Sequence, residues 1–405
     1  KPFARAGTPP RLHAAQSMPR SPYARLLLCL VSLALLAETR PPLGSCAAKR
    51  ASGEGAAGRA WSGIEPECRT KLEANRTAAA MRCLEGHFLE AREPGRRAGD
   101  FFTTLRKLRH DAEMITWLEQ EGKVKTEVKK LYRGIYHAAR PKHMHQPDKV
   151  FEVNFPEQND DRSLWQKAHN KAIYIDPVGK EVPKKTIRAK PVALQTFEES
   201  FASSGYAVID KLLTDGTLKK LLQFLQASTF YFYPRKDRHL MALLEDGLAS
   251  PLLAQLVDGL RLSLPALLGP LPLTGARAWK ADNSPLNDGV VQAPELTNSS
   301  ADAAVSVLLW TVPASALNGT AAHALELRRR RDGTDDEGSC AAAGAEGTSC
   351  AEASGETVAI VKYLPNRAVL WGPGLTAEWT GPDWQSGFLQ RGVHLLLTFG
   401  WTRCP

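Results

Sequence analysis

The sequence predicts an α+β protein in which a helical region is followed by antiparallel strands arranged as a sandwich or barrel. Between residues 64 and 140, apolar residues recur every three or four positions, which is the period of an amphipathic helix. After residue 270, short apolar runs are separated by Gly, Pro, Asn and Asp, as in antiparallel strands joined by turns. With 405 residues, the chain is long enough for one large domain or two modest ones.

The N-terminal segment, residues 1–47, has the features of a leader and secretory signal. Met18, the predicted start, is followed by Arg20 and Arg25, by an apolar run over residues 26–37 and then by small residues. The run is about a dozen residues, whereas roughly 20 are needed to cross a bilayer. We therefore expect a cleaved signal, no permanent membrane span, and residence in the endoplasmic reticulum lumen or outside the cell. An uncleaved signal anchor is the alternative.

The net charge of the chain gives little support for nucleic-acid binding. The formal charge is +9, but residues 1–47 hold six basic residues and one acidic residue. Without that segment the charge is +4. The basic character therefore belongs mainly to the targeting end, and no nucleic-acid partner is expected.

Three tripeptides match the acceptor sequence for N-linked glycosylation. They begin at Asn75, Asn298 and Asn318, and none has proline in the middle position. In a protein that enters the secretory pathway, these asparagines are candidate glycosylation sites.

The cysteine positions suggest two local disulfides. Cys68 and Cys83 lie in one helical segment, and Cys340 and Cys350 bracket a loop of small residues. An oxidising compartment favours disulfides at such positions. Free thiols are the alternative, because sequence does not settle pairing.

Composition divides the chain before the strand-rich region into three parts. Residues 48–63 are polar and rich in Gly and Ala, as in a linker; residues 64–140 are helical; residues 141–190 form an extended connecting arm rich in Lys, Pro and Asp. The apolar positions of the helices are Leu105, Leu108, Ala112, Ile115, Leu118, Val124, Val128 and Leu131.

The C-terminal domain, residues 191–405, begins with helices and continues with strands. The segment 205–213 is predicted to be a strand that leads into an amphipathic helix at 216–228, and a second helix is predicted over 250–269. The predicted strands that follow are 277–282, 304–312, 357–364, 367–372 and 392–401.

Five segments of the C-terminal domain carry a resemblance to a known family. They are residues 206–232, residues 243–273, "VSVLLWTVP" (305–313), "NRAVLWGPGLTAEWT" (366–380) and "RGVHLLLTFGW" (391–401). Together they resemble the 2-oxoglutarate/Fe(II) oxygenase superfamily, in particular its prolyl-hydroxylase-like domains, and keep the family's order over residues 195–402. The resemblance implies a double-stranded β-helix, or jelly roll, with supporting helices on one face.

The ligands that this family uses for iron are missing from the sequence. The family binds iron through two histidines and one carboxylate, which leaves three positions open for 2-oxoglutarate and O2. The resemblance puts Ser299, Ala301 and Ala377 at the ligand positions, and none of these side chains binds iron in the usual way. No histidine in the chain is followed two positions later by Asp or Glu. We therefore expect no catalytic residues and no bound metal or cofactor.

In two alternatives, the domain still binds a metal or a small molecule. The first is an unusual metal site made of Asp302, Glu378 and His394, for which Fe(II) and 2-oxoglutarate are the expected cofactors. Arg391 matches the neighbourhood of the arginine that binds the distal carboxylate of 2-oxoglutarate in the family, a role that suits a bidentate guanidinium. A surface arginine is the other interpretation of Arg391.

Residues 327–357 depart from the family pattern. The segment is low in apolar residues and replaces a region that helps to close the active site in relatives. A composition of this kind buries too little surface to order itself, so it is predicted to be an exposed insertion.

Three functions are consistent with the sequence. The first is a catalytically inactive oxygenase-like protein that acts as a binding or scaffolding module for an unidentified protein partner. The second is an active 2-oxoglutarate-dependent hydroxylase with non-standard ligands. The third is an interaction protein whose N-terminal helical region carries the activity while the jelly roll is a platform. Fold alone does not choose among them.

Overall fold

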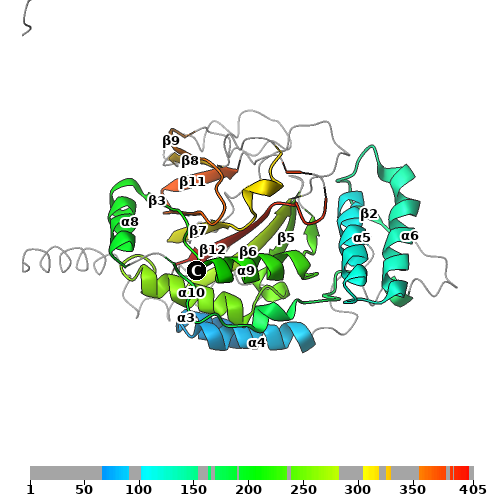
Figure 1. Ribbon diagram of the computed structural model, residues 1–405, viewed down its shortest axis with the longest axis horizontal. Helices are drawn as coiled ribbons and strands as arrows, with labels where there is room; N and C mark the ends of the chain where they lie inside the picture. Colours follow the sequence, from blue (N-terminus) through cyan, green and yellow to red (C-terminus); the bar gives the residue numbers. More distant parts are fainter. Residues whose placement is uncertain are drawn as a thin grey trace, which may run out of the picture. The chain divides into compact units, whose positions relative to one another are not determined.

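The computed structural model describes most of the chain between residues 66 and 400, as N-terminal helices followed by antiparallel sheets (Figure 1). The described ranges are 66–90, 102–153, 163–165, 169–188, 191–234, 239–281, 304–318, 325–329, 355–379, 384–385 and 387–400. The predicted signal, the predicted linker and Asn298, Ser299, Ala301, Asp302, Cys340 and Cys350 lie outside these ranges.

A helical hairpin opens the described structure. It consists of α3 (Pro66–Glu73) and α4 (Thr77–Glu90). A disulfide joins Cys68 to Cys83, which confirms that predicted pair. In the short connection, Asn75 has a φ of 56°, a left-handed conformation that asparagine tolerates better than most residues. The disulfide and the tight turn together fix the two helices side by side.

The hairpin packs on the C-terminal domain through α10 (Pro251–Ser263). Arg261 of α10 donates hydrogen bonds to Asn75 Oδ1 at 2.8 Å and to Thr77 Oγ1 at 2.6 Å. Helix α10 ends six residues before the predicted end at Gly269. The reason is Pro265, since the residue before a proline is disfavoured in the helical conformation.

A second helical pair, α5 (Leu105–Gln120) and α6 (Thr126–His143), has a core of its own. Thr104 caps α5 by accepting a hydrogen bond from the backbone N of Lys107 at 3.1 Å. Of the predicted apolar positions, six are fully buried there: Leu105, Leu108, Ala112, Ile115, Leu118 and Leu131. Their burial confirms the amphipathic prediction.

The predicted connecting arm is only partly extended. Helix α6 continues to His143, three residues past the predicted boundary. Two short strands, β1 (Phe102–Thr103) and β2 (Phe151–Glu152), then pair antiparallel, and a 3-10 helix, η2 (Pro177–Lys180), follows. The arm returns the chain to the C-terminal domain, where Tyr174 and Asp176 bond to the end of α9 described below.

The C-terminal domain contains a seven-stranded antiparallel sheet in the order β3-β10-β7-β12-β6-β5-β4. Its strands are β3 (Tyr206–Ile209), β4 (Tyr233–Pro234), β5 (His239–Leu243), β6 (Leu273–Ala281), β7 (Val305–Trp310), β10 (Ala368–Trp371) and β12 (Val393–Phe399). The short 3-10 helices of the domain are η3 (Leu244–Asp246) and η5 (Ala314–Ala316).

A second sheet has three antiparallel strands in the order β11-β8-β9. They are β8 (Leu325–Arg329), β9 (Thr357–Val361) and β11 (Leu375–Trp379). The predicted insertion at 327–357 therefore begins too early, because Leu327, Arg328 and Arg329 are strand residues that pair with β11. Leu325 and Leu327 are buried on one face, and this alternation is a strand signal that the composition of the whole segment hides.

Helices cover the face of the large sheet that is turned away from the small sheet (Figure 1). Helix α9 (Asp215–Ala227), capped by Thr214, and α10, capped by Ser250, lie below the large sheet in this view. Helix α8 (Pro191–Ser204) packs beside β3. On the opposite side, Trp310 of β7 contacts Trp379 of β11, so the two sheets enclose an interior.

These elements confirm the predicted fold class, an α+β protein with N-terminal helices, supporting helices and antiparallel sheets in a jelly-roll arrangement. Among the residues that the structure describes, none of the helices has the length and apolar character needed to cross a membrane.

Candidate functional site

The interior between the two sheets, where the family resemblance places an iron site, is occupied by aromatic side chains. We call Trp310, Tyr363, Trp379, Trp384 and His394 the aromatic cluster. The His394 ring lies 4.5 Å from the Trp379 ring and 5.7 Å from the Trp384 ring, measured between centroids. Trp310 stacks on Tyr363 at 5.1 Å and meets Trp379 edge-on at 5.7 Å. Such distances are those of packed aromatic pairs.

His394 is held in this cluster by its position in β12, the strand between β6 and β7. Only 3% of its surface is exposed, and neither ring nitrogen has a hydrogen-bond partner among the described residues. Burial lowers the pKa of His394 well below its usual value, and the nearby His239 lowers it further. The imidazole is therefore neutral in the folded protein near pH 7.

Tyr363, the other ionisable side chain of the aromatic cluster, is also neutral. The Tyr363 hydroxyl donates a 2.6 Å hydrogen bond to the carbonyl oxygen of Val312, and burial raises the pKa of this phenol above its usual value. The cluster therefore presents neutral, largely apolar groups to the interior.

Two of the predicted ligand positions on β11 face opposite directions. Ala377 is 1% exposed and points to the interior, where its methyl group offers no atom to a metal. Glu378, the next residue, points outward: its side chain is 49% exposed and lies 3.3 Å from Arg328. Because Trp379 faces His394 and neighbouring strand residues alternate, the structure does not bring Glu378 and His394 together.

Arg391 is buried, but its described ionic partner lies outside the barrel. Its guanidinium forms an ion pair with Glu113 of α5 and lies 5.7 Å from the centre of the Phe388 ring. Only 1% of Arg391 is exposed. The arginine therefore joins the C-terminal strand segment to the helical pair, and its proposed role in binding 2-oxoglutarate stays a prediction.

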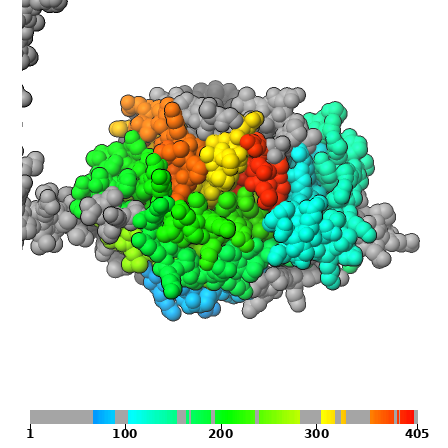
Figure 2. Space-filling view, in the orientation of Figure 1, coloured from blue at the N-terminus to red at the C-terminus, as the bar shows by residue number. Residues whose placement is uncertain are grey.

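The junction between the helical pair and the C-terminal domain contains further buried charge. Lys280 of β6 donates to the carbonyl oxygen of Gln226 at 2.9 Å, and its ammonium lies 4.4 Å from the centre of the Tyr231 ring. Burial lowers the pKa of Lys280 well below its usual value, and repulsion from Arg391 adds to the effect. In the space-filling view, the red C-terminal segment borders the cyan helices at this junction (Figure 2).

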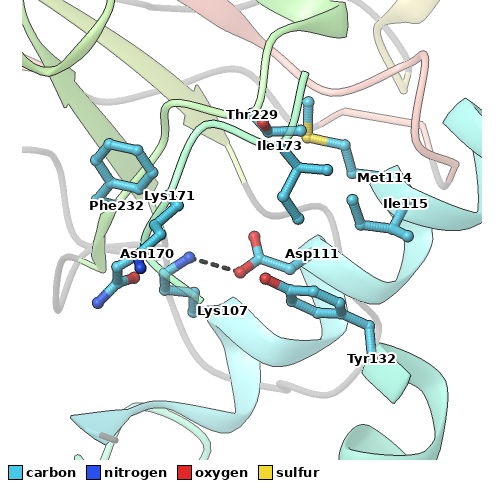
Figure 3. Close-up of a pocket in the computed structure, with 10 residues that line it drawn as sticks. All are labelled: Lys107, Asp111, Met114, Ile115, Tyr132, Asn170, Lys171, Ile173, Thr229 and Phe232. Atoms are coloured by element: carbon cyan, nitrogen blue, oxygen red, sulfur yellow. Dashed lines mark hydrogen bonds and ion pairs between the residues drawn. The ribbon is translucent and has the colours of Figure 1, made fainter. Parts of the chain in front are cut away.

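A pocket lies beside this junction (Figure 3). Its space, including some open solvent, amounts to about 270 Å³. It is lined by Lys107, Asp111, Met114, Ile115, Tyr132, Asn170, Lys171, Ile173, Thr229 and Phe232. The helices α5 and α6 supply half of these residues, and the connecting arm supplies Asn170, Lys171 and Ile173.

The charges in the pocket are organised around Asp111. Its carboxylate lies 2.5 Å from the Lys107 ammonium and 3.0 Å from His110 Nδ1. Burial alone raises the pKa of Asp111, but the charge and hydrogen bond of Lys107, together with His110, hold it well below its usual value. Asp111 is therefore ionised, and it neutralises Lys107. This pocket was not predicted from the sequence, although Lys107 and Asp111 are four residues apart on a helix and so share a face.

The described residues do not fit the family's metal centre. Of the three ligand positions that the resemblance assigns, the structure describes only that of Ala377, which has no donor atom. Within the described ranges, the one group of three His, Cys, Asp or Glu side chains close enough to share a metal ion is Cys68, Cys83 and His87, on α3 and α4.

Comparison with known proteins identifies similar folds. No model of a known protein family matches the sequence, and no curated protein matches it. Over about half of its length, the chain is similar to solved structures of 2-oxoglutarate/Fe(II) oxygenases.

Three of these structures illustrate the similarity. A prolyl hydroxylase from Trichoplax adhaerens is 12% identical, with a TM-score of 0.34; 52% of this chain and 90% of that chain are covered. The α-ketoglutarate-dependent epimerase SnoN is 11% identical, with a TM-score of 0.35, covering 52% and 84% of the two chains. HygX from Streptomyces hygroscopicus is 16% identical, with a TM-score of 0.34, covering 52% and 87%.

The burial of neutral His394 predicts a pH dependence of stability. Because its pKa is lowered on folding, the unfolded chain takes up the proton first as pH falls. The contribution of neutral His394 to the free energy of unfolding is therefore complete above about pH 6.5. Below that pH, the contribution falls by up to about 1.4 kcal/mol per pH unit. When the pH is lowered from about 7.5 to about 5, the free energy of unfolding is expected to fall by about 2 kcal/mol less in a His394→Leu variant than in the wild type, as measured by urea unfolding.

The matched control is His137→Leu, since His137 is exposed on α6. This control is expected to keep the pH dependence of the wild type. An identical pH dependence for His394→Leu and the wild type contradicts the assignment of His394 as a buried neutral group.

Proposed function

We propose that the protein is a non-catalytic relative of the 2-oxoglutarate/Fe(II) oxygenases that acts as a binding or scaffolding module in the secretory pathway. The observation that carries the proposal is the aromatic cluster, which occupies the interior where the resemblance places the iron. A catalytic iron needs three protein ligands and three open positions. The interior instead holds four large rings around a neutral imidazole, with a methyl group at Ala377.

The orientation of β11 argues against an unusual active site. Such a site needs Asp302, Glu378 and His394 to converge on one ion. Glu378 points away from the interior and interacts with Arg328, so bringing it to His394 requires reversal of the strand's two faces. An active dioxygenase with these ligands is therefore the less favoured function.

The secretory part of the proposal rests on the predicted signal and on two structural features that suit it. The Cys68–Cys83 disulfide is of the kind that persists in oxidising compartments. Asn75 and Asn318, which begin two of the acceptor tripeptides, are both exposed.

Glycosylation tests this part. When the full chain is produced in eukaryotic cells, we expect an endoglycosidase that removes N-linked glycans to lower its mass. The mass shift is expected to shrink in an Asn318→Gln variant. A protein recovered from the cytosol, with no mass shift, contradicts secretory residence.

Anaerobic titration calorimetry tests the non-catalytic proposal. Fe(II) and then 2-oxoglutarate are titrated into the full chain, and the metal content of the protein as isolated is measured. We expect no saturable iron binding, because the interior lacks the ligands and the open space. Tight binding of one equivalent of iron, lost in His394→Leu, contradicts the proposal and favours the active dioxygenase.

The pocket favours a second candidate, in which the helical region carries the binding activity. It offers two ammonium groups, and since Lys107 is paired with Asp111, the charge of Lys171 is the surplus. A small carboxylate ligand neutralises the charge of Lys171, and Met114 and Ile115 then lie beside the apolar part of the ligand.

A separate titration of 2-oxoglutarate into the full chain, with no iron added, tests this candidate. Binding of 2-oxoglutarate without iron, lost in Lys171→Met and kept in Lys362→Met, supports a site in the pocket. Lys362 is the matched control because it is exposed and far from the pocket in the sequence. Absence of metal-independent binding, or equal binding by both variants, rules the pocket out for this ligand.

A further inference from the structure

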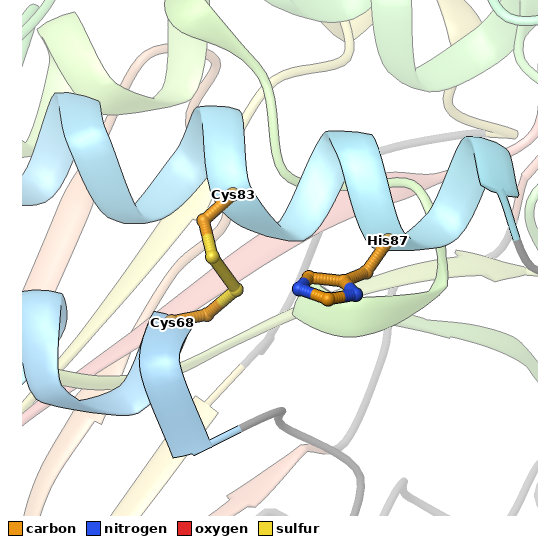
Figure 4. A group of neighbouring side chains, drawn as sticks. All are labelled: Cys68, Cys83 and His87. Carbon is orange, nitrogen blue, oxygen red and sulfur yellow. A yellow bond between two sulfur atoms is a disulfide. The ribbon is translucent and has the colours of Figure 1, made fainter.

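We propose that Cys68, Cys83 and His87 form a zinc site that becomes available when the Cys68–Cys83 disulfide is reduced. One ligand atom from each residue lies within 4.8 Å of the others (Figure 4). Two thiolates and one imidazole are a common ligand set for Zn²⁺, which then keeps a fourth position for water or another ligand. The inference goes beyond the proposed function and does not depend on it.

The hairpin already places the three side chains on one side. Cys83 and His87 are four residues apart on α4, so they occupy the same helix face. Cys68 reaches them from α3, with its Cα 5.5 Å from that of Cys83. Figure 4 shows the His87 ring beside the sulfur pair. In a tetrahedral site with Zn–S bonds of about 2.3 Å, two sulfurs lie roughly 3.8 Å apart, which the reduced side chains reach by rotation.

The surroundings of Cys68 suit a zinc complex without net charge. Cys68 is 0% exposed, and it packs in the same core as Leu72 and Met81. An unpaired thiolate at this position is unfavourable, because a buried charge is costly without compensation. One Zn²⁺ with two thiolates and a neutral imidazole has no net charge, so the complex suits a buried site.

The chemistry requires a reductant and releases protons. A dithiol reduces the disulfide and becomes a disulfide itself, so that two electrons and two protons give the thiols of Cys68 and Cys83. Zn²⁺ then displaces the two thiol protons and forms two Zn–S bonds, while His87 contributes a nitrogen lone pair. No other oxidant or co-reactant is needed.

Substitution of His87 distinguishes a zinc site from a disulfide that is purely structural. A disulfide that only fastens α3 to α4 needs the two cysteines and has no use for the imidazole. A zinc site needs all three side chains, so substitution of His87 changes metal binding while leaving the disulfide intact.

Cobalt titration of the full chain tests the site. The protein is reduced with a phosphine, which does not compete as a thiol, and the phosphine is removed without oxygen. Co²⁺ is then added, followed by Zn²⁺. We expect one equivalent of Co²⁺ to give thiolate-to-metal charge-transfer absorption and the visible bands of tetrahedral cobalt, and Zn²⁺ to remove both. The protein that has not been reduced is expected to give neither.

Variants assign the signal to these residues. Because even residues that only support a metal ligand are worth about 10–100-fold in affinity, we expect His87→Gln to weaken Co²⁺ binding at least tenfold. Cys83→Ser is expected to abolish the charge-transfer absorption at this site. His137→Gln, at an exposed position of α6, is expected to change nothing. Circular dichroism confirms that each variant is folded.

Two results overturn the proposal. One is a reduced wild-type protein without the tetrahedral thiolate spectrum. The other is a spectrum of equal strength and affinity in His87→Gln, which assigns the metal to other cysteines among the seven in the chain. His87→Gln keeps both cysteines and the disulfide, so this arm does not depend on the folding of the cysteine variant.

Discussion

The structure of the C-terminal domain depends on the central strand β12. It forms hydrogen-bonded ladders with β6 on one side and β7 on the other, and all seven of its residues are buried. Because neighbouring residues of a strand point to opposite faces, β12 contributes side chains to the hydrophobic core on both faces of the large sheet. Leu395 and Leu397 lie on the same face as Val393, and His394 faces the small sheet, where the aromatic cluster lies.

The alternating side-chain directions along β12 decide which residues fill the interior of the domain. On the inner face, His394 is surrounded by rings and has a lowered pKa, so that the space in which the resemblance expects a metal is used for packing. Just before the strand, Arg391 pairs with Glu113 and ties the helical pair to the domain. The binding function proposed above therefore involves outer surfaces, namely the charged pocket at the junction or the helical hairpin.

Much of the fold follows from the sequence, and much of the site does not. The periods of the apolar residues predict α5 and α6 and five strands of the large sheet, but not β4 and β5 at one edge of it, since local periodicity reflects which face is buried. Strand β8 was missed because five residues that border a polar segment carry a weak signal. The lack of a ligand at Ala377 is visible in the sequence, but the burial of Arg391 against Glu113 is a contact between residues far apart in the chain. The pocket at Asp111 is equally non-local, because the arm supplies part of its wall.

The central claim is that the aromatic cluster is a packed core rather than the wall of a ligand site, and the stability of a Trp379→Ala variant tests it most directly. Trp379 is 2% exposed. Urea unfolding is expected to show a loss of about 3–5 kcal/mol, as for a large aromatic removed from a core. Leu262→Ala, at a residue that is 83% exposed, is the control and is expected to stay within about 0.5 kcal/mol of the wild type. A loss below about 1 kcal/mol for Trp379→Ala, the size of an ordinary surface effect, contradicts the claim.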